Sequence, residues 1–191
     1  MACRLSKRGE GFLKIALIVE GFSDNILLSE QRRWFSSLGM EIDIITAGDK
    51  RSMIRKAIKF YNASIASGAS HVIFLPDQNG DQCALVTRKK VNADDLPRAT
   101  TLVIKRELEA WILADRRCLN CKLDPNYHTS GTTDNVPNPK QILFSLIHKK
   151  LGYTPTAVEA AKIFADQFSI VRAAVANNSA KRLVNIVNSL V

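Results

Sequence analysis

Short apolar runs alternate with amphipathic segments through the first 117 residues of the chain. The run from Leu13 to Val19 is apolar and rich in β-branched residues, a pattern typical of a strand that is covered on both faces. Residues 41–46, 71–75 and 100–104 have the same character. The pattern therefore predicts four strands.

The segments between these predicted strands have helical periodicity. In residues 23–38, Leu27 and Trp34 share one apolar stripe. Residues 54–65 repeat apolar side chains at helical spacing, Ile58 among them, and a third helix is expected after the fourth strand. Because strands alternate with helices, we expect an α/β fold in which a mainly parallel, Rossmann-like sheet of four strands is flanked by helices.

The pattern changes at position 118. Residues 118–139 are rich in Asn, Asp, Thr, Gly and Pro, as is typical of a long loop. Beyond them, three segments are expected to be helical: residues 140–150, 156–168 and 179–190. The predicted organisation is an α/β core over residues 1–117, a loop or insertion over residues 118–139, and a helical C-terminal extension packed on the core over residues 140–191.

Composition narrows the class of protein. The chain has 191 residues, of which 46% are hydrophobic and 24% charged, and this is the profile of a globular domain with a substantial core. No apolar run approaches the roughly 20 residues that cross a bilayer, and the basic start of the chain lacks the cleavage site of a signal peptide. The four cysteines are sparse and irregularly spaced. We therefore expect a cytoplasmic protein with no membrane partner.

The chain is strongly basic, with 27 Lys and Arg against 18 Asp and Glu and a net charge of +9. Such a charge attracts polyanions, of which nucleic acid is the commonest in a cell, although ordinary solubility charge explains the same excess equally well. Two basic runs fall near the predicted acidic edge described next and are candidates for nucleic-acid backbone contacts. They consist of Arg88, Lys89, Lys90, Arg116 and Arg117.

Acidic side chains follow three of the predicted strands at the point where each strand ends. The carboxyl ends of parallel strands meet at one edge of a sheet, so these side chains are expected to lie close together. Crowded carboxylates repel each other unless a cation neutralises them, which favours a hard, oxygen-ligated Mg²⁺ or Mn²⁺. The other interpretation is that each acid is only a helix cap or a solvated loop residue. The candidate ligands are Glu20, Asp24, Asp77, Asn79, Asp81, Glu107 and Glu109.

Three segments resemble a known family. Val19-Glu20-Gly21-Phe22-Ser23-Asp24 resembles the first motif of the TOPRIM domain of primases, type II topoisomerases and overcoming-lysogenization-defect nucleases. The segment from Leu75 to Asp81 lies where the family has its second, Asp-x-Asp motif. Residues 107–115 resemble a signature of small bacterial TOPRIM-like proteins related to those nucleases. The resemblance covers about residues 13–117.

What this resemblance implies is Mg²⁺-dependent endonuclease cleavage of DNA or RNA. Glu20, Asp77 and Glu109 would be catalytic residues of the metal centre, and Lys162 would bring a cation to the scissile phosphate. Related nucleases act as effectors of bacterial anti-phage systems together with an ABC-type or AAA-type ATPase. The sequence has no P-loop, so a partner chain is expected to supply that ATPase, and a homodimer stays open as a further assembly.

Asn79 departs from the family pattern, because it stands where the second aspartate of the Asp-x-Asp pair is expected. An amide binds a divalent cation less strongly than a carboxylate does. The alternative function is therefore a catalytically degenerate subunit that binds nucleic acid or the ATPase. A small-molecule phosphotransferase or phosphatase is a second alternative, which the charge of +9 disfavours.

Cys118 and Cys121 form one Cys-x-x-Cys pair, with His128 and His148 as conceivable further zinc ligands. A structural zinc site normally has a second pair at a set spacing, and the sequence has none. Zinc is therefore not expected.

Overall fold

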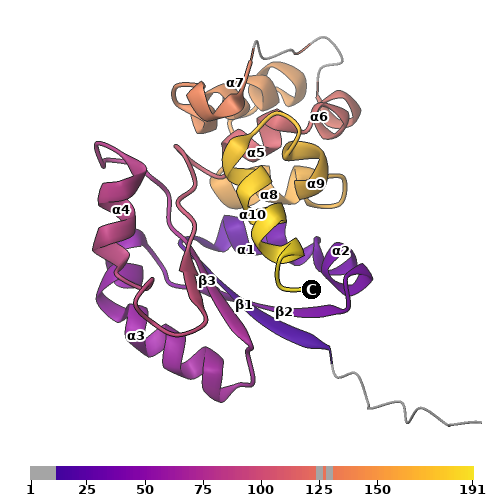
Figure 1. Ribbon diagram of the computed structural model, residues 1–191. Helices are drawn as coiled ribbons and strands as arrows, with labels where there is room; N and C mark the ends of the chain where they lie inside the picture. The colour runs from indigo at the N-terminus through magenta and orange to yellow at the C-terminus, as the bar shows by residue number, and fades with distance from the viewer. Residues whose placement is uncertain (1–11, 124–126, 128–130) are drawn as a thin grey trace, which may run out of the picture.

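Four parallel strands form the central sheet of the computed structural model, which describes residues 12–123, 127 and 131–191 (Figure 1). The strand order is β2-β1-β3-β4, which confirms the predicted α/β fold with a parallel four-stranded sheet flanked by helices. The strands are β1 (Leu13–Val19), β2 (Met40–Thr46), β3 (His71–Leu75) and β4 (Ala99–Thr101).

The pairing of β3 with the fourth segment continues beyond the three residues of β4. The amides of Leu102 and Ile104 donate to the carbonyls of Phe74 and Pro76, both at 2.9 Å, and Ile104 forms a parallel bridge with Asp77. The segment predicted as a strand over residues 100–104 therefore follows β3 to its end. This pairing fixes Asp77 at the carboxyl edge of the sheet.

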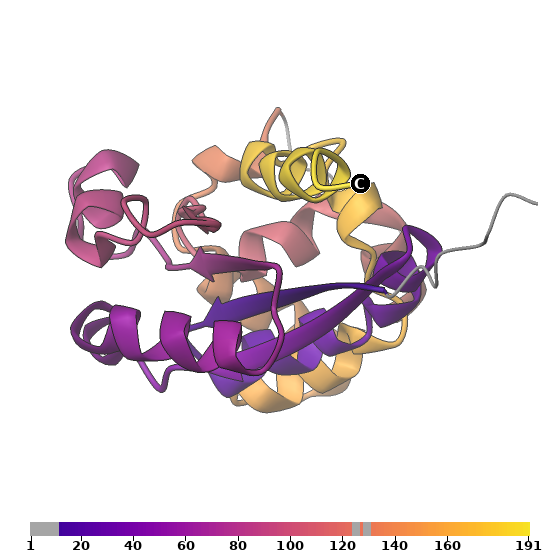
Figure 2. The same ribbon diagram turned by 60° about the horizontal axis from the view of Figure 1, so that its bottom comes forward.

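Alternating residues of β1 serve two different cores. Ile15, Leu17 and Val19 face the helices that follow β1 and β4, whereas Ala16 and Ile18 face the opposite layer. That opposite layer consists of α3 (Lys50–Ala66) and α4 (Ala84–Val91) (Figure 2). Both faces of the sheet are covered, as its apolar strands require.

The single helix expected over residues 23–38 is two helices, α1 (Phe22–Ser29) and α2 (Arg32–Ser37). Gln31 lies at the break and is buried. Its side chain donates to the carbonyl of Phe168 at 2.9 Å and accepts from the amide of Ile170 at 3.1 Å. The break buries Phe35, which the predicted stripe did not include, while Trp34 is partly buried and packs against the same core as Leu27.

The buried face of α3 differs from the apolar stripe predicted for residues 54–65. In α3 the buried residues include Met53, Ala57 and Ser64, whereas Ile58 is 63% exposed. The long apolar side chains of α3 are thus not all on the face that packs on the sheet. Small residues on that face, such as Ala57 and Ser64, allow the helix to approach the sheet closely. The sequence analysis did not predict α4, because three of its four apolar residues are adjacent rather than at helical spacing.

Part of the stretch expected to be a loop is helical. Asp115 caps α6 (Arg116–Lys122) by accepting from the amide of Cys118, and a short 3-10 helix, η1, occupies Thr133–Asn135. The segment from Leu123 to Thr132 is non-helical wherever the structure describes it.

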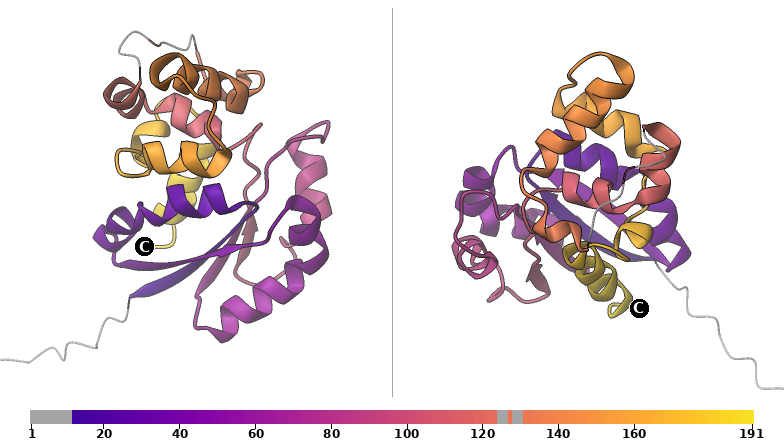
Figure 3. Two further views of the ribbon diagram at one scale, coloured as in Figure 1. Left: turned by 180° about the vertical axis from the view of Figure 1, so that it is seen from behind. Right: turned by 90° about the horizontal axis from the view of Figure 1, so that it is seen from above.

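The C-terminal helices gather on the α1 side of the sheet, around α5 (Glu109–Ala114), and α8 (Ala157–Ala165) lies along α1 (Figure 3). Phe164 and Leu183 share one core with Trp111, whose Nε1 donates to Ser179 Oγ at 2.8 Å. These helices are α7 (Pro139–Leu151), α8 (Ala157–Ala165), α9 (Ile170–Ala173) and α10 (Asn178–Asn188). Within the described residues, none of the helices has the length and apolar character needed to cross a bilayer.

An ion pair between Arg172 and Asp115 ties α5 and α6 to α9. The fully buried carboxylate of Asp115 accepts two bonds from Arg172, each of 2.8 Å, and one of 2.8 Å from the amide of Ser169. Together with the cap on Cys118, these bonds satisfy a charge that would otherwise be buried without compensation.

We expect Asp115→Asn to lower the free energy of unfolding by about 1.5–3 kcal/mol, because it weakens the charge-assisted hydrogen bonds that Arg172 donates to a fully buried carboxylate. Urea denaturation followed by circular dichroism measures the loss. Asp166→Asn is the matched control, since Asp166 pairs with Lys122 at the surface and its loss is expected to cost about 1 kcal/mol or less. Equal losses in the two variants would contradict this account.

Candidate functional site

The carboxyl ends of β1 and β3 are joined through an acidic side chain. Glu20 directly follows β1, and its Oε1 accepts a hydrogen bond of 2.8 Å from the amide of Asp77, which follows β3. This bond fixes the Glu20 side chain beside Asp77.

Asp24 lies in the first turn of α1. Its Oδ2 accepts from the amide of Gly21 at 2.9 Å, so the carboxylate folds back over the turn between β1 and the helix. A negative charge in this position is favourable at a helix N-terminus. The charge of Asp24 also helps to raise the pKa of Asp77, as expected for two carboxylates at the same edge of the sheet.

Glu107 and Glu109 reach the same edge from the turn that leads into α5. The backbone of Arg106 takes the left-handed conformation, with φ of 69°, which reverses the chain just before Glu107. Glu109 opens α5 and is 8% exposed. Glu107 precedes the helix and accepts a bond of 2.8 Å from the side-chain amide of Asn79. Both glutamates therefore face the site.

Most of the acids at this edge have raised pKa values, as expected for carboxyl groups that are buried close to one another. Burial raises the pKa of Asp77 well above its usual range, and repulsion from four other carboxylates raises it further. Burial also raises the pKa values of Glu20, Asp24 and Glu109. The acids that the fold brings together are Glu20, Asp24, Asp77, Glu107 and Glu109, and we call them the acid cluster.

A lysine that the sequence analysis missed lies against the acid cluster. Lys140 is in the first turn of α7, and its Nζ is 3.3 Å from Glu109 and 3.7 Å from Glu107. Burial opposes the charged form, but attraction to Glu109 and Glu107 outweighs it and raises the pKa of Lys140. A cation in the first turn of a helix is unfavourable, so a lysine at this position of the helix predicted over residues 140–150 indicates that it pairs with an acid elsewhere.

Lys162, the lysine expected near the scissile phosphate, is exposed on α8 and lies beside Glu159. The lysine in contact with the acids is Lys140 instead. Lys140 is 31 residues after Glu109 in the sequence, and the two meet only because the chain between them folds back.

Asp81 has different partners from the acid cluster. Its carboxylate accepts from Lys50 at 3.1 Å, from Thr87 at 2.7 Å and from Lys90, and these bonds hold its pKa well below the usual range. Lys50 also donates to the carbonyl of Asn79. Asp81 therefore joins the loop after β3 to α3 and α4, which explains its position without a metal.

The two predicted basic runs are on different helices. Arg88, Lys89 and Lys90 form the exposed last turn of α4, where Arg88 pairs with Asp94 at 2.6 Å. Arg116 and Arg117 are exposed at the start of α6. Contact of these residues with nucleic acid stays a prediction.

A cavity of about 170 Å³ opens beside the acid cluster. Glu107 and Lys140 line it together with Arg106 and Asn79. An anion in this cavity would meet the cationic side chains of Arg106 and Lys140 next to the carboxylates.

The acid cluster has the donor chemistry for a hard cation, but its oxygens are engaged. Among the residues that the structure describes, no three Asp, Glu, His or Cys side chains are already arranged to hold a metal ion. Lys140 contacts oxygens of Glu107 and Glu109, and backbone amides donate to Glu20 and Asp24. Carboxylate oxygens are ligands that Mg²⁺ and Mn²⁺ prefer, so the donor set suits such a cation in its chemistry. A cation bound there would have to displace the Lys140 ammonium from Glu107 and Glu109.

The cysteine pair considered for zinc lies on α6. Cys118 is buried, donates weakly to the carbonyl of Phe164 at 3.7 Å, and has its pKa raised to about 12 by burial. Cys121 is exposed, His148 lies 3.4 Å from Thr154 Oγ1, and His128 lies outside the described residues.

Comparison of the chain with protein-family models, with curated proteins and with solved structures finds no match.

We expect Asp77→Asn to stabilise the metal-free protein at about pH 8, because the amide carries no charge for burial and for the neighbouring carboxylates to oppose. The pKa of Asp77 is higher in the folded state than in the unfolded chain, so the wild type gains stability as pH falls through that folded pKa. The advantage of the variant therefore shrinks with acidification and is constant below about 3.9, the ordinary pKa of aspartate.

Urea denaturation in EDTA across this pH range measures the effect. Asp43→Asn is the control, since Asp43 pairs with Lys14 at the surface, 2.7 Å away. An Asp77→Asn protein that is less stable than wild type at alkaline pH would show that the acid cluster is not under electrostatic strain.

Proposed function

We propose that this chain is a metal-dependent nuclease with a TOPRIM-like fold, which hydrolyses phosphodiester bonds of DNA or RNA. The observation that carries the proposal is the position of Asp77, which lies at the carboxyl edge of a parallel sheet among four other carboxylates. Such an arrangement is costly for a purely structural cluster, and a divalent cation would relieve it.

The metal ligands would come from Glu20, Asp24, Asp77 and Glu109, with Glu107 and Asn79 at the rim. A bound Mg²⁺ or Mn²⁺ would activate a water molecule and neutralise charge on the phosphate. The chain's own contribution is to fix the carboxylates on three strand ends, so that little reorganisation is needed during the reaction.

Lys140 has a second use in this proposal. Its ammonium neutralises Glu107 and Glu109 in the absence of substrate and lines the adjoining cavity with Arg106. When it leaves the carboxylates, it can hold a non-bridging phosphate oxygen at the mouth of the site. A flexible lysine stem allows both positions.

Nucleic-acid binding is supported by the excess of basic residues. The net charge is +9 although the acid cluster concentrates five carboxylates at one edge, so the remaining surface is more basic than the total suggests. The exposed arginines and lysines on α4 and α6 supply groups for sequence-independent phosphate contacts.

The biological setting that we propose rests on the TOPRIM-like motifs. The chain would be the effector subunit of a bacterial anti-phage system, with an ABC-type or AAA-type ATPase as partner, because it has no P-loop of its own. A homodimer is compatible with this setting.

One alternative is favoured by two specific observations. Asn79 supplies an amide instead of a carboxylate and donates to Glu107, and Lys140 already neutralises two of the acids. Both features suit a catalytically degenerate subunit, which would use the same fold to bind nucleic acid or the ATPase without cleaving.

We expect Glu20→Gln and Asp77→Asn each to reduce Mg²⁺-dependent cleavage by more than about a hundredfold, because each removes a central ligand charge. Cleavage of a plasmid and of a tRNA is followed on gels with Mg²⁺, with Mn²⁺ and with EDTA, alone and with a candidate ATPase. Asp43→Asn is expected to cleave like the wild type. Full activity of a purified Glu20→Gln protein would refute the nuclease assignment, and binding without cleavage in every condition would support the degenerate subunit.

Asn79→Asp is expected to change metal binding and metal-free stability in opposite directions. The variant loses the hydrogen bond to Glu107 and adds a charge to the acid cluster, so the metal-free protein becomes less stable. With Mn²⁺, the added carboxylate strengthens binding by about tenfold. Calorimetric titration and urea denaturation measure the two effects, and unchanged Mn²⁺ affinity would place position 79 outside the metal centre.

A further inference from the structure

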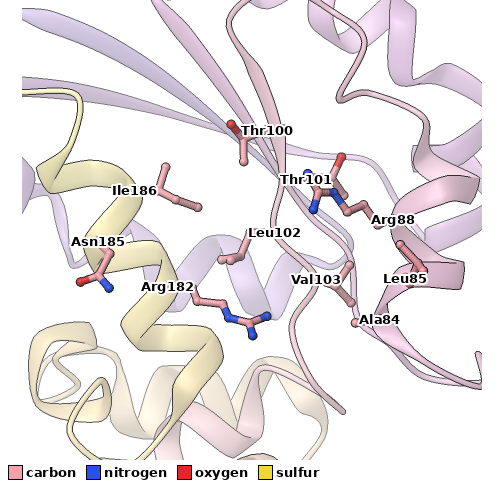
Figure 4. Close-up of a pocket in the computed structure, with 10 residues that line it drawn as sticks. All are labelled: Ala84, Leu85, Arg88, Thr100, Thr101, Leu102, Val103, Arg182, Asn185 and Ile186. Atoms are coloured by element: carbon pink, nitrogen blue, oxygen red, sulfur yellow. The ribbon is translucent and has the colours of Figure 1, made fainter.

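The sheet ends at β4, and a groove runs along the outer side of this strand between α4 and α10 (Figure 4). Its volume is about 610 Å³, which makes it far larger than the cavity beside the acid cluster. Leu85 and Arg88 line it from α4, Thr101 and Val103 from the strand segment, and Arg182 and Ile186 from α10. No member of the acid cluster lines this groove.

The backbone of the strand presents hydrogen-bonding groups to the groove. Leu102 and Ile104 donate their amides toward β3. Residues alternate along a strand, so Thr101 and Val103 direct their backbone groups to the outer side. An edge of this kind can pair with an added strand.

A carboxylate already lies on this edge. Asp94 accepts from the backbone amide of Thr101 at 2.9 Å and from Arg88 Nε at 2.6 Å. An incoming strand would offer a main-chain carbonyl to the first donor and an acidic side chain to the second. Asp94, which is exposed, therefore occupies the two donors that an acidic strand would use, the Thr101 amide and the Arg88 guanidinium.

The side chain of Thr101 supplies an independent indication of a ligand. Thr101 is 5% exposed, and its Oγ1 is the buried side-chain polar atom that lacks a hydrogen-bond partner within the described residues. A buried hydroxyl without a partner is destabilising. Thr101 lines the groove, so a polar side chain of a bound segment would lie near this hydroxyl.

The charges on the two walls select the kind of strand. Arg88 stands on the α4 wall and Arg182 on the α10 wall (Figure 4). Successive residues of an extended peptide point to opposite faces, so two adjacent acidic residues would each meet one arginine. The apolar side chains of Leu85 and Ile186 suit aliphatic residues on either side of that acidic pair.

Two other occupants fit less well. A second copy of this chain would bring the same arginines together in a molecule that already has a charge of +9. A nucleic-acid strand would be expected to stack its bases on aromatic side chains, and the groove is lined by none.

We propose that the outer edge of β4 is a docking site for an extended, acidic segment of a partner protein, which adds a strand to the sheet between α4 and α10. The site uses none of the residues of the metal centre, and the inference stands whether or not the chain is a nuclease.

The probe is a fluorescein-labelled hexapeptide in which two adjacent glutamates are flanked by valine and threonine on each side. Binding to the full chain is measured by fluorescence anisotropy. A second peptide of the same sequence, N-methylated at alternate backbone amides, cannot complete the strand pairing. A third peptide with lysines in place of the glutamates tests the charge, and a labelled oligothymidylate tests nucleic acid.

Three variants separate the groove from general electrostatics. Arg182→Glu is expected to weaken binding of the acidic peptide by at least about tenfold. Lys181→Glu makes the same charge reversal on α10 outside the groove lining and is expected to have little effect. Asp94→Ala removes the carboxylate that occupies the edge and is expected to strengthen binding by about tenfold.

Binding of the acidic peptide that responds to these variants in this way, and that is lost on N-methylation, supports the proposal. It is overturned if the acidic peptide does not bind, if the N-methylated peptide binds equally well, or if both charge reversals weaken binding equally. Oligothymidylate binding with the same dependence on Arg182 would assign the groove to nucleic acid. Peptide-independent dimerisation that Arg182→Glu alters would assign it to a second copy.

Discussion

The parallel pairing of β1 with β3, and of β3 with the segment after β4, forces several carboxylates to share one edge of the sheet. Glu20 and Asp77 cannot move apart without breaking the hydrogen bond between them or the strand register behind it. The fold must therefore neutralise the charge where it stands. It does so with backbone amides, with the amide of Asn79 and with the ammonium of Lys140.

The C-terminal helices complete this arrangement from outside the sheet. The α7 helix begins at Pro139 and places Lys140 against Glu107 and Glu109. Its position depends on the packing of α5 with α7 and α9, and the Trp111–Ser179 hydrogen bond ties α5 to α10 as well. The helical extension is thus part of the candidate site as well as a cover for the sheet, and the charge balance of the acids depends on its packing.

Acidic residues outside the cluster have a consistent structural use. Asp81 joins the loop after β3 to two lysines, Asp115 joins α6 to α9 through Arg172, and Asp94 covers the free edge of β4. Each of these carboxylates accepts hydrogen bonds from a lysine or an arginine, which neutralises its charge. Asp77 differs because the charges that act most strongly on its pKa are those of other acids, and this contrast separates the candidate site from ordinary ion pairs.

The sequence alone determined the sheet and all five members of the acid cluster, because apolar runs define strands and the residues after parallel strands must meet at one edge. It could not determine the break at Gln31, which depends on hydrogen bonds to Phe168 and Ile170 far along the chain. Nor could it place Lys140 rather than Lys162 against the acids, since that choice is made by how the C-terminal helices pack. Local periodicity identified the buried strands, whereas contacts between distant segments decide where helices break and which charges meet.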